Sequence, residues 1–153
     1  MSSIPTSSPT TSAPKAPVTL NIKGLSAPKR DVTWFQMKFE QAIDPDGQVA
    51  AVPRGGKIKI KMKALNDGNS DLLCWMIDKK QTHSGSIEFL NTTDGKLMKS
   101  YVFTDAYCVE YEEQWEDPTR NNDLSHWEQI TISCRTITNS GAMDFKNNWE
   151  LVE

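Results

Sequence analysis

The chain has 153 residues, the size of one domain, which argues against two independent cores. Acidic residues number 20 against 17 basic ones, so the formal net charge is -3. Nucleic-acid-binding domains usually carry a surplus of Lys and Arg, so no nucleic-acid partner is expected. No stretch approaches the roughly 18 consecutive apolar residues that cross a bilayer, so no membrane insertion is expected either.

The first 17 residues are almost all Ser, Thr, Pro and Ala, with a single charge at Lys15. This stretch has neither the basic start nor the apolar centre of a secretory signal peptide. Because it has little to bury, we expect residues 1–17 to form a disordered tail and residues 18–153 to form a single domain.

The three cysteines, Cys74, Cys108 and Cys134, are far apart and odd in number. Their spacing matches neither a disulfide framework nor a zinc site, so each is interpreted as a small buried apolar residue. This usage suits a reducing cytosol and is compatible with later export of the folded protein.

The first half of the domain alternates apolar and polar residues with the period of β-strands. Val18, Leu20 and Ile22 mark a first strand that ends at Gly24, and a second strand of about ten residues is predicted over 34–43. The sequence Asp-Pro-Asp-Gly at 44–47 predicts a turn, since Pro presets φ and Gly accepts a positive φ.

Residues 57–63 show the clearest alternation in the chain. Three apolar residues point one way and four lysines the other: Ile58, Ile60 and Met62 against Lys57, Lys59, Lys61 and Lys63. A strand with one apolar and one charged face is typical of an antiparallel sheet that is wetted on one side.

One helix of about ten residues is predicted to follow, capped by Asn69 or Ser70. Asp71 suits its first turn and residues 79–80, both Lys, suit its last. Its apolar arc should contain Leu72, Leu73, Trp75, Met76 and Ile77, with Cys74 and Asp78 opposite.

The rest of the chain again favours strands. They are predicted over 86–91, over 97–115 after a hairpin turn at 93–95, over 126–138, and over 147–153, with a loop at 117–125. The second of these is too long for an ordinary strand, and a bend or break is expected near Asp105. Six or seven strands with one helix, and no alternation of strand and helix, point to an antiparallel barrel or sandwich.

Catalytic candidates are few. His83 and His126 have no nucleophile motif around them, and Gly55-Gly56 precedes a strand where a phosphate loop would precede a helix. The acidic run at 110–117 is interpreted as a solvated or charge-paired strand face rather than as paired catalytic carboxylates. We therefore expect no enzyme activity, no catalytic residue, no metal and no cofactor.

The two charged strand faces are more informative together. Lysines of one strand and glutamates of another would attract if the strands were adjacent, or if they met across an interface between identical subunits. The residues concerned are Lys57, Lys59 and Lys61 with Glu110 and Glu112. Spacing alone leaves open that both faces are merely solvated.

Five blocks of the sequence form an ordered set. They are Arg54-Gly55-Gly56-Lys57-Ile58, Leu72-Leu73-Cys74-Trp75-Met76, Gly85-Ser86-Ile87-Glu88-Phe89, Phe103-Thr104-Asp105-Ala106-Tyr107-Cys108-Val109-Glu110-Tyr111 and Ile130-Thr131-Ile132-Ser133. Together they resemble the tube proteins of type VI secretion systems, in the branch found in Bacteroidetes and called TssD or Hcp. The blocks occur in the family's order and cover roughly residues 48 to 138.

The resemblance implies a mainly β fold, an Hcp-like antiparallel β-barrel with one short α-helix. It also implies a homohexameric ring whose copies stack into a hollow tube within a contractile sheath. Implied partners are the protein itself, sheath proteins, the spike and baseplate, and secreted effectors. The implied location is the bacterial cytoplasm before firing and the extracellular space or a target cell afterwards.

Some features depart from the family pattern: the tail, the strand at 34–43, the loop at 118–125 and the chain end at 149–151. They leave room for a specialised paralogue that carries cargo or lies near the spike or baseplate, and for the tube of a related extracellular contractile particle. A monomeric ligand-binding barrel and an enzyme that uses Glu110 and Glu112 are the more distant alternatives.

Overall fold

The computed structural model describes residues 16–49, 54–65, 67–117, 119, 125–139 and 143–147. Most of the tail predicted at 1–17 and of the strand predicted at 147–153 therefore lies outside the described residues, as does most of the loop predicted at 117–125. The elements in chain order are β1 (Val18–Ile22), β2 (Lys29–Glu40), β3 (Arg54–Lys63), α1 (Asp71–Ile77), β4 (His83–Leu90), β5 (Leu97–Trp115), β6 (His126–Ser133), β7 (Thr136–Asn139) and β8 (Met143–Lys146).

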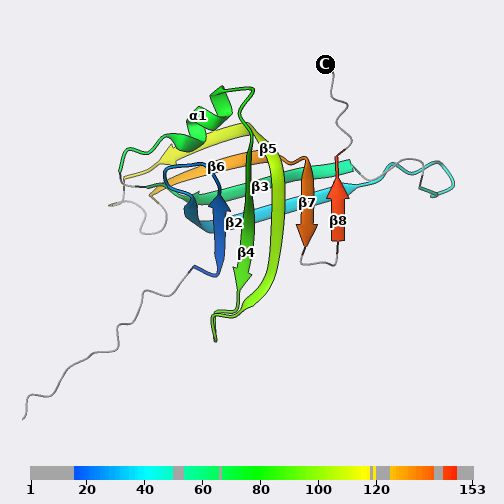
Figure 1. The fold of residues 1–153 in the computed structure, drawn as a ribbon, viewed down its shortest axis with the longest axis horizontal. Helices are drawn as coiled ribbons and strands as arrows, with labels where there is room; N and C mark the ends of the chain where they lie inside the picture. The colour runs from blue at the N-terminus through cyan, green and yellow to red at the C-terminus, as the bar shows by residue number, and fades with distance from the viewer. Residues whose placement is uncertain are drawn as a thin grey trace, which may run out of the picture.

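Six strands close into an antiparallel ring. Their order is β4-β1-β2-β3-β6-β5, and β5 returns to pair with β4; β7 and β8 extend the sheet beyond β5. The predicted antiparallel barrel with one helix is confirmed. Figure 1 shows β2, β3 and β6 running across the molecule, while β4 and the first half of β5 run nearly at right angles to them.

Two long strands, β2 and β5, turn the corner between these directions. The start of β2 pairs with β1, and its remainder pairs with β3. The first part of β5 pairs with β4 as far as Ala106, and the part from Tyr107 pairs with β6. Between them Asp105 has a φ of +46°, an uncommon conformation for a residue other than Gly, which confirms the predicted bend. A closed barrel needs such corners because a straight 19-residue strand would overshoot it.

The alternating residues of the strands fill the inside of the ring. The apolar face predicted for β3 is confirmed, since Ile58, Ile60 and Met62 are all fully buried. Ile130 and Ile132 of β6 lie opposite Ile60 and Ile58, and are buried too. Each such side chain contributes roughly 1.5–3 kcal/mol relative to an exposed one, so this interior dominates the stability of the barrel.

One ion pair lies inside the barrel. The Arg30 Nη2 atom of β2 donates to Glu128 Oε1 of β6 at 2.7 Å, and both side chains are almost completely buried. The Tyr111 hydroxyl donates to the other carboxylate oxygen at 2.6 Å. Burial, followed by the hydrogen bond to Glu128, raises the pKa of Tyr111 well above its usual value. These contacts satisfy a buried carboxylate from two strands, as such a charge requires.

The helix is shorter than predicted, at seven residues, and two of its five predicted core residues are exposed. Leu72 and Trp75 are buried and Met76 partly so, whereas Leu73 and Ile77 are 37% and 73% exposed. A helix of two turns presents only one i, i+3 pair fully to the barrel, which explains the error. Cys74 is exposed, so the prediction of three buried cysteines is wrong for this one.

Several strand boundaries also differ from the prediction, including the starts of β3 and β4, which come three residues earlier. The strand expected over 126–138 is divided into β6 and β7, and both Cys134 and Arg135 lie outside any strand. The second strand begins at Lys29, five residues before the predicted start, because pairing with Glu128 allows a charged residue, Arg30, to point inward. Within the described part of the chain, no helix has the length and apolar character that a membrane crossing requires.

Candidate assembly surface

The outer face of β2, β3, β6 and the second half of β5 carries the charged residues singled out in the sequence. The register of the three strand pairs places the outward residues in rows across the sheet. The rows are Trp34–Lys61–Gln129–Glu112, Gln36–Lys59–Thr131–Glu110 and Lys38–Lys57–Ser133–Tyr107.

Opposite charges lie at opposite sides of this face. The lysines are on β2 and β3, the residues of β6 between them are neutral, and the glutamates are on β5. The lysines of β3 are therefore not adjacent to the glutamates within one chain, because β6 separates them by roughly 10 Å, two strand spacings. Among the residues that the structure describes, no carboxylate lies within ion-pair distance of Lys57, Lys59 or Lys61.

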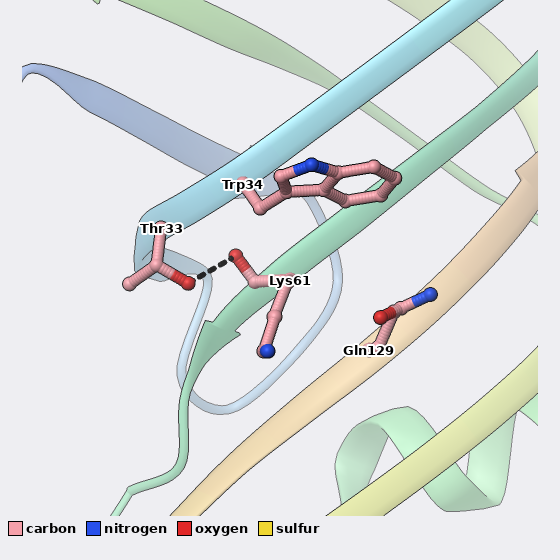
Figure 2. Close-up of a pocket in the computed structure, with 4 residues that line it drawn as sticks. All are labelled: Thr33, Trp34, Lys61 and Gln129. Carbon is pink, nitrogen blue, oxygen red and sulfur yellow. Dashed lines mark hydrogen bonds between the residues drawn. The ribbon is translucent and has the colours of Figure 1, made fainter. Parts of the chain in front are cut away.

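A shallow pocket of about 340 Å³ opens at one end of the basic side. Figure 2 shows its four lining residues, Thr33 and Trp34 from β2, Lys61 from β3 and Gln129 from β6. The Thr33 hydroxyl donates to the carbonyl oxygen of Lys61 at 3.1 Å. The register shifts between Val32 and Trp34, and both Thr33 and Trp34 are exposed, the latter by 43%.

The Lys61 ammonium is itself held in place. The ammonium lies 4.0 Å from the centre of the Trp127 ring and makes a cation–π contact with it. Trp127 is the second residue of β6. Figure 2 shows the Lys61 ammonium pointing away from the Trp34 indole, so the cation contacts Trp127 and leaves the Trp34 ring without it.

A second shallow pocket, of about 530 Å³, continues along the same two strands. Its lining residues are Gln36, Lys38, Glu40, Gly55, Lys57 and Lys59. Lys38 is paired with Glu40 at 2.6 Å, and this hydrogen-bonded contact raises the pKa of the lysine and lowers that of the glutamate. Both side chains are exposed, so the pair contributes little to stability.

The acidic side of the face lies against α1. Glu110 and Glu112 are exposed, and they line a pocket with Met76 of α1 and Val109 of β5. The register of β5 against β6 shifts between Cys108 and Glu110, so Val109 is the extra residue of a bulge. An enzyme built on Glu110 and Glu112 would need them in an enclosed site, whereas both side chains are exposed on the strand face.

The four-stranded sheet that carries this face has two unpaired edges. Trp34 to Glu40 of β2 pair with β3 alone, because β1 pairs with β2 only up to Asp31. The stretch of β5 from Tyr107 to Trp115 pairs with β6 alone, because β4 pairs with β5 only up to Ala106. These pairings concern the described strands, and each edge leaves backbone N–H and C=O groups available to another chain.

The histidines form structural contacts. His83 Nδ1 lies 2.9 Å from the Lys23 carbonyl oxygen, and its ring packs edge-on against Trp75, with the ring centres 5.0 Å apart. His126 Nε2 lies 2.8 Å from a carboxylate oxygen of Glu113. Within the described ranges, no group of three or more His, Cys, Asp and Glu side chains could hold a metal ion.

Sequence reasoning identified the lysines and glutamates of this face and missed its aromatic part. Trp34 was assigned to a strand only, and Trp127 was not singled out. The signal was the outward phase of β6, in which the partly exposed Trp127 and Gln129 alternate with the buried Glu128 and Ile130. Which strands lie side by side could not be inferred from any one of them.

Comparison with known protein families gives a match over most of the chain. The family model described as hemolysin coregulated protein Hcp (TssD) matches residues 16–150. No significant match to a curated protein sequence is found.

Three solved structures illustrate the likeness. Hcp1 from Flavobacterium johnsoniae, a member of the Bacteroidetes, is 28% identical with a TM-score of 0.73, covering 85% of this chain and 98% of that one. A mutant of Hcp1 from the E. coli EAEC 042 pathovar is 14% identical with a TM-score of 0.66, covering 87% and 99%. The sheath–tube complex of PVC, an extracellular contractile injection system, is 15% identical with a TM-score of 0.52, covering 90% of this chain and 99% of that one. At such low sequence identity, the last two similarities concern the fold alone.

Proposed function

This chain belongs to the Hcp (TssD) family, and we propose that it is the structural subunit of the inner tube of a contractile type VI secretion system. Six copies form a ring, and the rings stack into a hollow tube that carries effectors to target cells. Its function is assembly rather than catalysis.

The observation that carries this proposal is the pair of unpaired edges on one sheet. Sheet edges of this length are rarely left open in a monomeric protein, because they invite pairing with another chain. In this sheet the open edges lie on β2 and β5, the two lateral strands. The molecule therefore offers one strand edge on each side of the sheet, and each edge carries both N–H donors and C=O acceptors.

The two edges also match in direction. The sheet has four strands in the order β2-β3-β6-β5, and every neighbouring pair is antiparallel, so β2 and β5 run in opposite directions. When β5 of one copy meets β2 of the next, the two strands continue the antiparallel ladder. A head-to-tail contact of this kind repeats, and it ends when the rotation between copies closes a ring.

Such a ring would place the charged face on its inside. One face of the four-stranded sheet is covered by the core of its own barrel, and the remaining strands and α1 belong to the rest of the molecule (Figure 1). The outer face, with its rows of Lys, Gln and Glu, is then the wall of the channel. A polar wall suits a conduit through which folded cargo passes.

Lys57, Lys59 and Lys61, with Glu110 and Glu112, would set the register between neighbours. The glutamates lie on β5 at one side of the face, and the lysines lie on β3, one strand in from the opposite side. Joining copies edge to edge places the acidic strand of one subunit about two strand spacings, roughly 10 Å, from the basic strand of the next, which equals the separation within one chain. This distance is close to the Debye length at physiological salt, so the attraction between the charges is partly screened and weakens as the salt concentration rises.

The partners and locations of this subunit follow from the same proposal. They are the contractile sheath around the tube, the spike and baseplate at its end, and effectors in its channel. The protein would be made in the bacterial cytoplasm and leave it on firing. The likeness to the PVC sheath–tube complex favours one second candidate, the tube of an extracellular contractile particle.

Electron microscopy of the purified protein tests the central proposal. Negatively stained samples should show rings with an open centre, and cylinders at higher concentration. A protein that stays monomeric by light scattering at millimolar concentration would contradict the proposal and would favour the alternative of a monomeric ligand-binding barrel.

A further inference from the structure

The two shallow pockets on β2 and β3 form one groove, which we call the lysine–tryptophan groove. Its residues are Thr33, Trp34, Gln36, Lys38, Glu40, Gly55, Lys57, Lys59, Lys61 and Gln129. The pockets follow each other along the strands, because Trp34, Gln36 and Lys38 are successive outward residues of β2. The groove from Trp34 to Lys38 is therefore about 13 Å long, the length of four extended residues.

The groove has an uncompensated positive charge. Glu40 is held by Lys38, which leaves Lys57, Lys59 and Lys61 without a carboxylate among the residues described. They lie at alternate positions of one strand, so their ammonium groups recur about every 7 Å along the groove. Acidic side chains at alternate positions of an extended peptide have the same repeat.

The groove also has an apolar platform and neutral hydrogen-bonding groups. The Trp34 indole is 43% exposed at the end where Lys61 is held against Trp127. Gln129 and Gln36 add amide groups that can both donate and accept. A ligand that satisfies all three features has carboxylates, an aromatic or apolar side chain beside them, and backbone amides.

We propose that the lysine–tryptophan groove binds an acidic, extended peptide segment that places an apolar side chain on Trp34. This inference rests on the proposed function, since a peptide bound to the channel wall would be part of a cargo protein. It gives the tube a selectivity, because segments that present acidic residues and an aromatic residue on the same face of an extended chain would be retained and basic ones would not.

A polyanion such as a nucleic acid fits the groove less well. Glu40 lies within it, and Glu110 and Glu112 lie two strands away on the same face. A phosphate backbone with a charge at every nucleotide would meet these carboxylates, and the chain as a whole has a net charge of -3. A short peptide with a few spaced carboxylates avoids them.

Fluorescence anisotropy with the full chain tests the inference. The probe is a labelled hexapeptide with Asp at positions 1 and 3 and Phe at position 5, which share one face of an extended chain, and with Asn at the other positions. It is compared with a peptide in which Asn replaces Asp and with an oligothymidylate of equal charge. The acidic peptide should bind at least about tenfold more tightly than either, and its affinity should fall as salt rises. Lys61→Gln and Trp34→Ala should each weaken binding by about tenfold.

Matched controls separate the groove from general charge and hydrophobicity. Lys79→Gln removes an exposed lysine after α1, and Met98→Ala removes an exposed apolar side chain of β5; both should bind like the unaltered chain. Equal binding by Lys61→Gln, tighter binding of the oligonucleotide, or no binding of the acidic peptide at millimolar concentration would overturn the inference.

Micrographs of the same samples keep the two proposals apart. The groove is open on a single copy, so peptide binding does not require rings. Rings without peptide binding would overturn the groove assignment alone, whereas specific binding by a chain that never forms rings would overturn the tube and leave a peptide-binding protein.

Discussion

At the scale of single residues, the two glycines at the start of β3 are each required for a different physical reason. A Cβ atom on Gly55 would lie 2.2 Å from the Phe39 ring, which covers this position. Gly56 has a φ of +86°, and a Cβ atom there would lie 2.4 Å from Asn147 Nδ2 and 3.0 Å from the Cys134 carbonyl oxygen. Asn147 Nδ2 in turn donates to the carbonyl oxygens of Cys134 and Gly55, so the glycines admit a link that fastens the end of β8 to the start of β3.

Gly56→Ala should therefore destabilise the fold by at least about 2 kcal/mol, from both the left-handed φ and the crowding. Gly47→Ala is the matched control, because Gly47 has a φ of +83° and nothing within 4 Å of its Cβ position. That change should cost only about 1 kcal/mol. Thermal unfolding at one protein concentration compares them, and equal losses would show that the contact with Asn147 is not limiting.

The three thiols should differ in reactivity. Burial raises the pKa of Cys108 and of Cys134 to about 12, while Cys74 is exposed on α1. A thiol reagent at pH 8 should therefore modify one cysteine quickly in the native protein and three after denaturation. Mass spectrometry identifies the modified residue; rapid labelling of Cys134 in the native state would contradict the buried position.

The raised pKa values of Cys108 and Cys134 also predict the direction in which alkali changes the stability of the fold. The ordinary thiol pKa of 9.0 applies to the unfolded chain, so the unfolded state ionises first as the pH rises. The contribution of Cys108 and Cys134 to stability is complete below pH 9 and is lost progressively between pH 9 and about 12.

At the scale of the elements, the buried pair of Arg30 and Glu128 links β2 to β6 through the inside of the barrel. The two strands are not neighbours, since β3 lies between them. Arg30 also donates to the carbonyl oxygen of Lys63 at 2.8 Å, and its Nε atom is buried without a partner among the described residues. A cross-barrel contact of this kind fixes the position of β2, whose outer edge is the one that we assign to the subunit contact.

Glu128→Gln should destabilise the barrel by about 3–5 kcal/mol, because it leaves the Arg30 charge buried without its counter-ion. The double variant Arg30→Met with Glu128→Leu removes both charges and should recover most of this loss. Urea denaturation of the three proteins measures the difference. A double variant as unstable as the single one would mean that the charge is not the cause.

The sequence predicted the elements better than their partners. Alternation located β1, β3 and β5, including the bend at Asp105, because each strand has one buried and one wetted face. It misplaced the start of β2, because an inward Arg30 looks like a surface residue until Glu128 is known to face it. It joined β6 and β7, since Cys134 and Arg135 continue the alternation without a Gly or Pro to end it.

The candidate surface was predictable only in part, for a related reason. The alternation of lysines in β3 and glutamates in β5 is local and can be read along the chain. That β6 lies between them, and that the edges of β2 and β5 are open, depends on strand order. Strand order is set by contacts between residues far apart in the sequence, which a single sequence does not contain.

At the scale of the whole molecule, the tube proposal predicts that charge reversal acts between copies. The double variant Lys59→Glu with Lys61→Glu should weaken ring or tube formation without unfolding the barrel, because both side chains point away from the core. Gel filtration and electron microscopy at physiological salt measure assembly, and circular dichroism checks the fold. Unaltered assemblies would show that these lysines do not set the register.

A second reversal tests whether the glutamates are the partners. Glu110→Lys with Glu112→Lys should also impair assembly, and the combination of all four changes should restore it at least in part. The reversal of Lys79 and Lys80, which are exposed in the turn after α1 and belong to none of the rows of this face, controls for net charge. If the combination is worse than either pair, the two groups act independently.

The core has one further consequence. Each barrel builds its hydrophobic core from the strands and helix of a single chain, so this core needs no neighbour to form. Subunits of this kind can accumulate in folded form, associate through their contact surfaces when a scaffold recruits them, and dissociate afterwards without unfolding. Reuse of the subunits would then depend on the strength of the contacts between them and not on refolding.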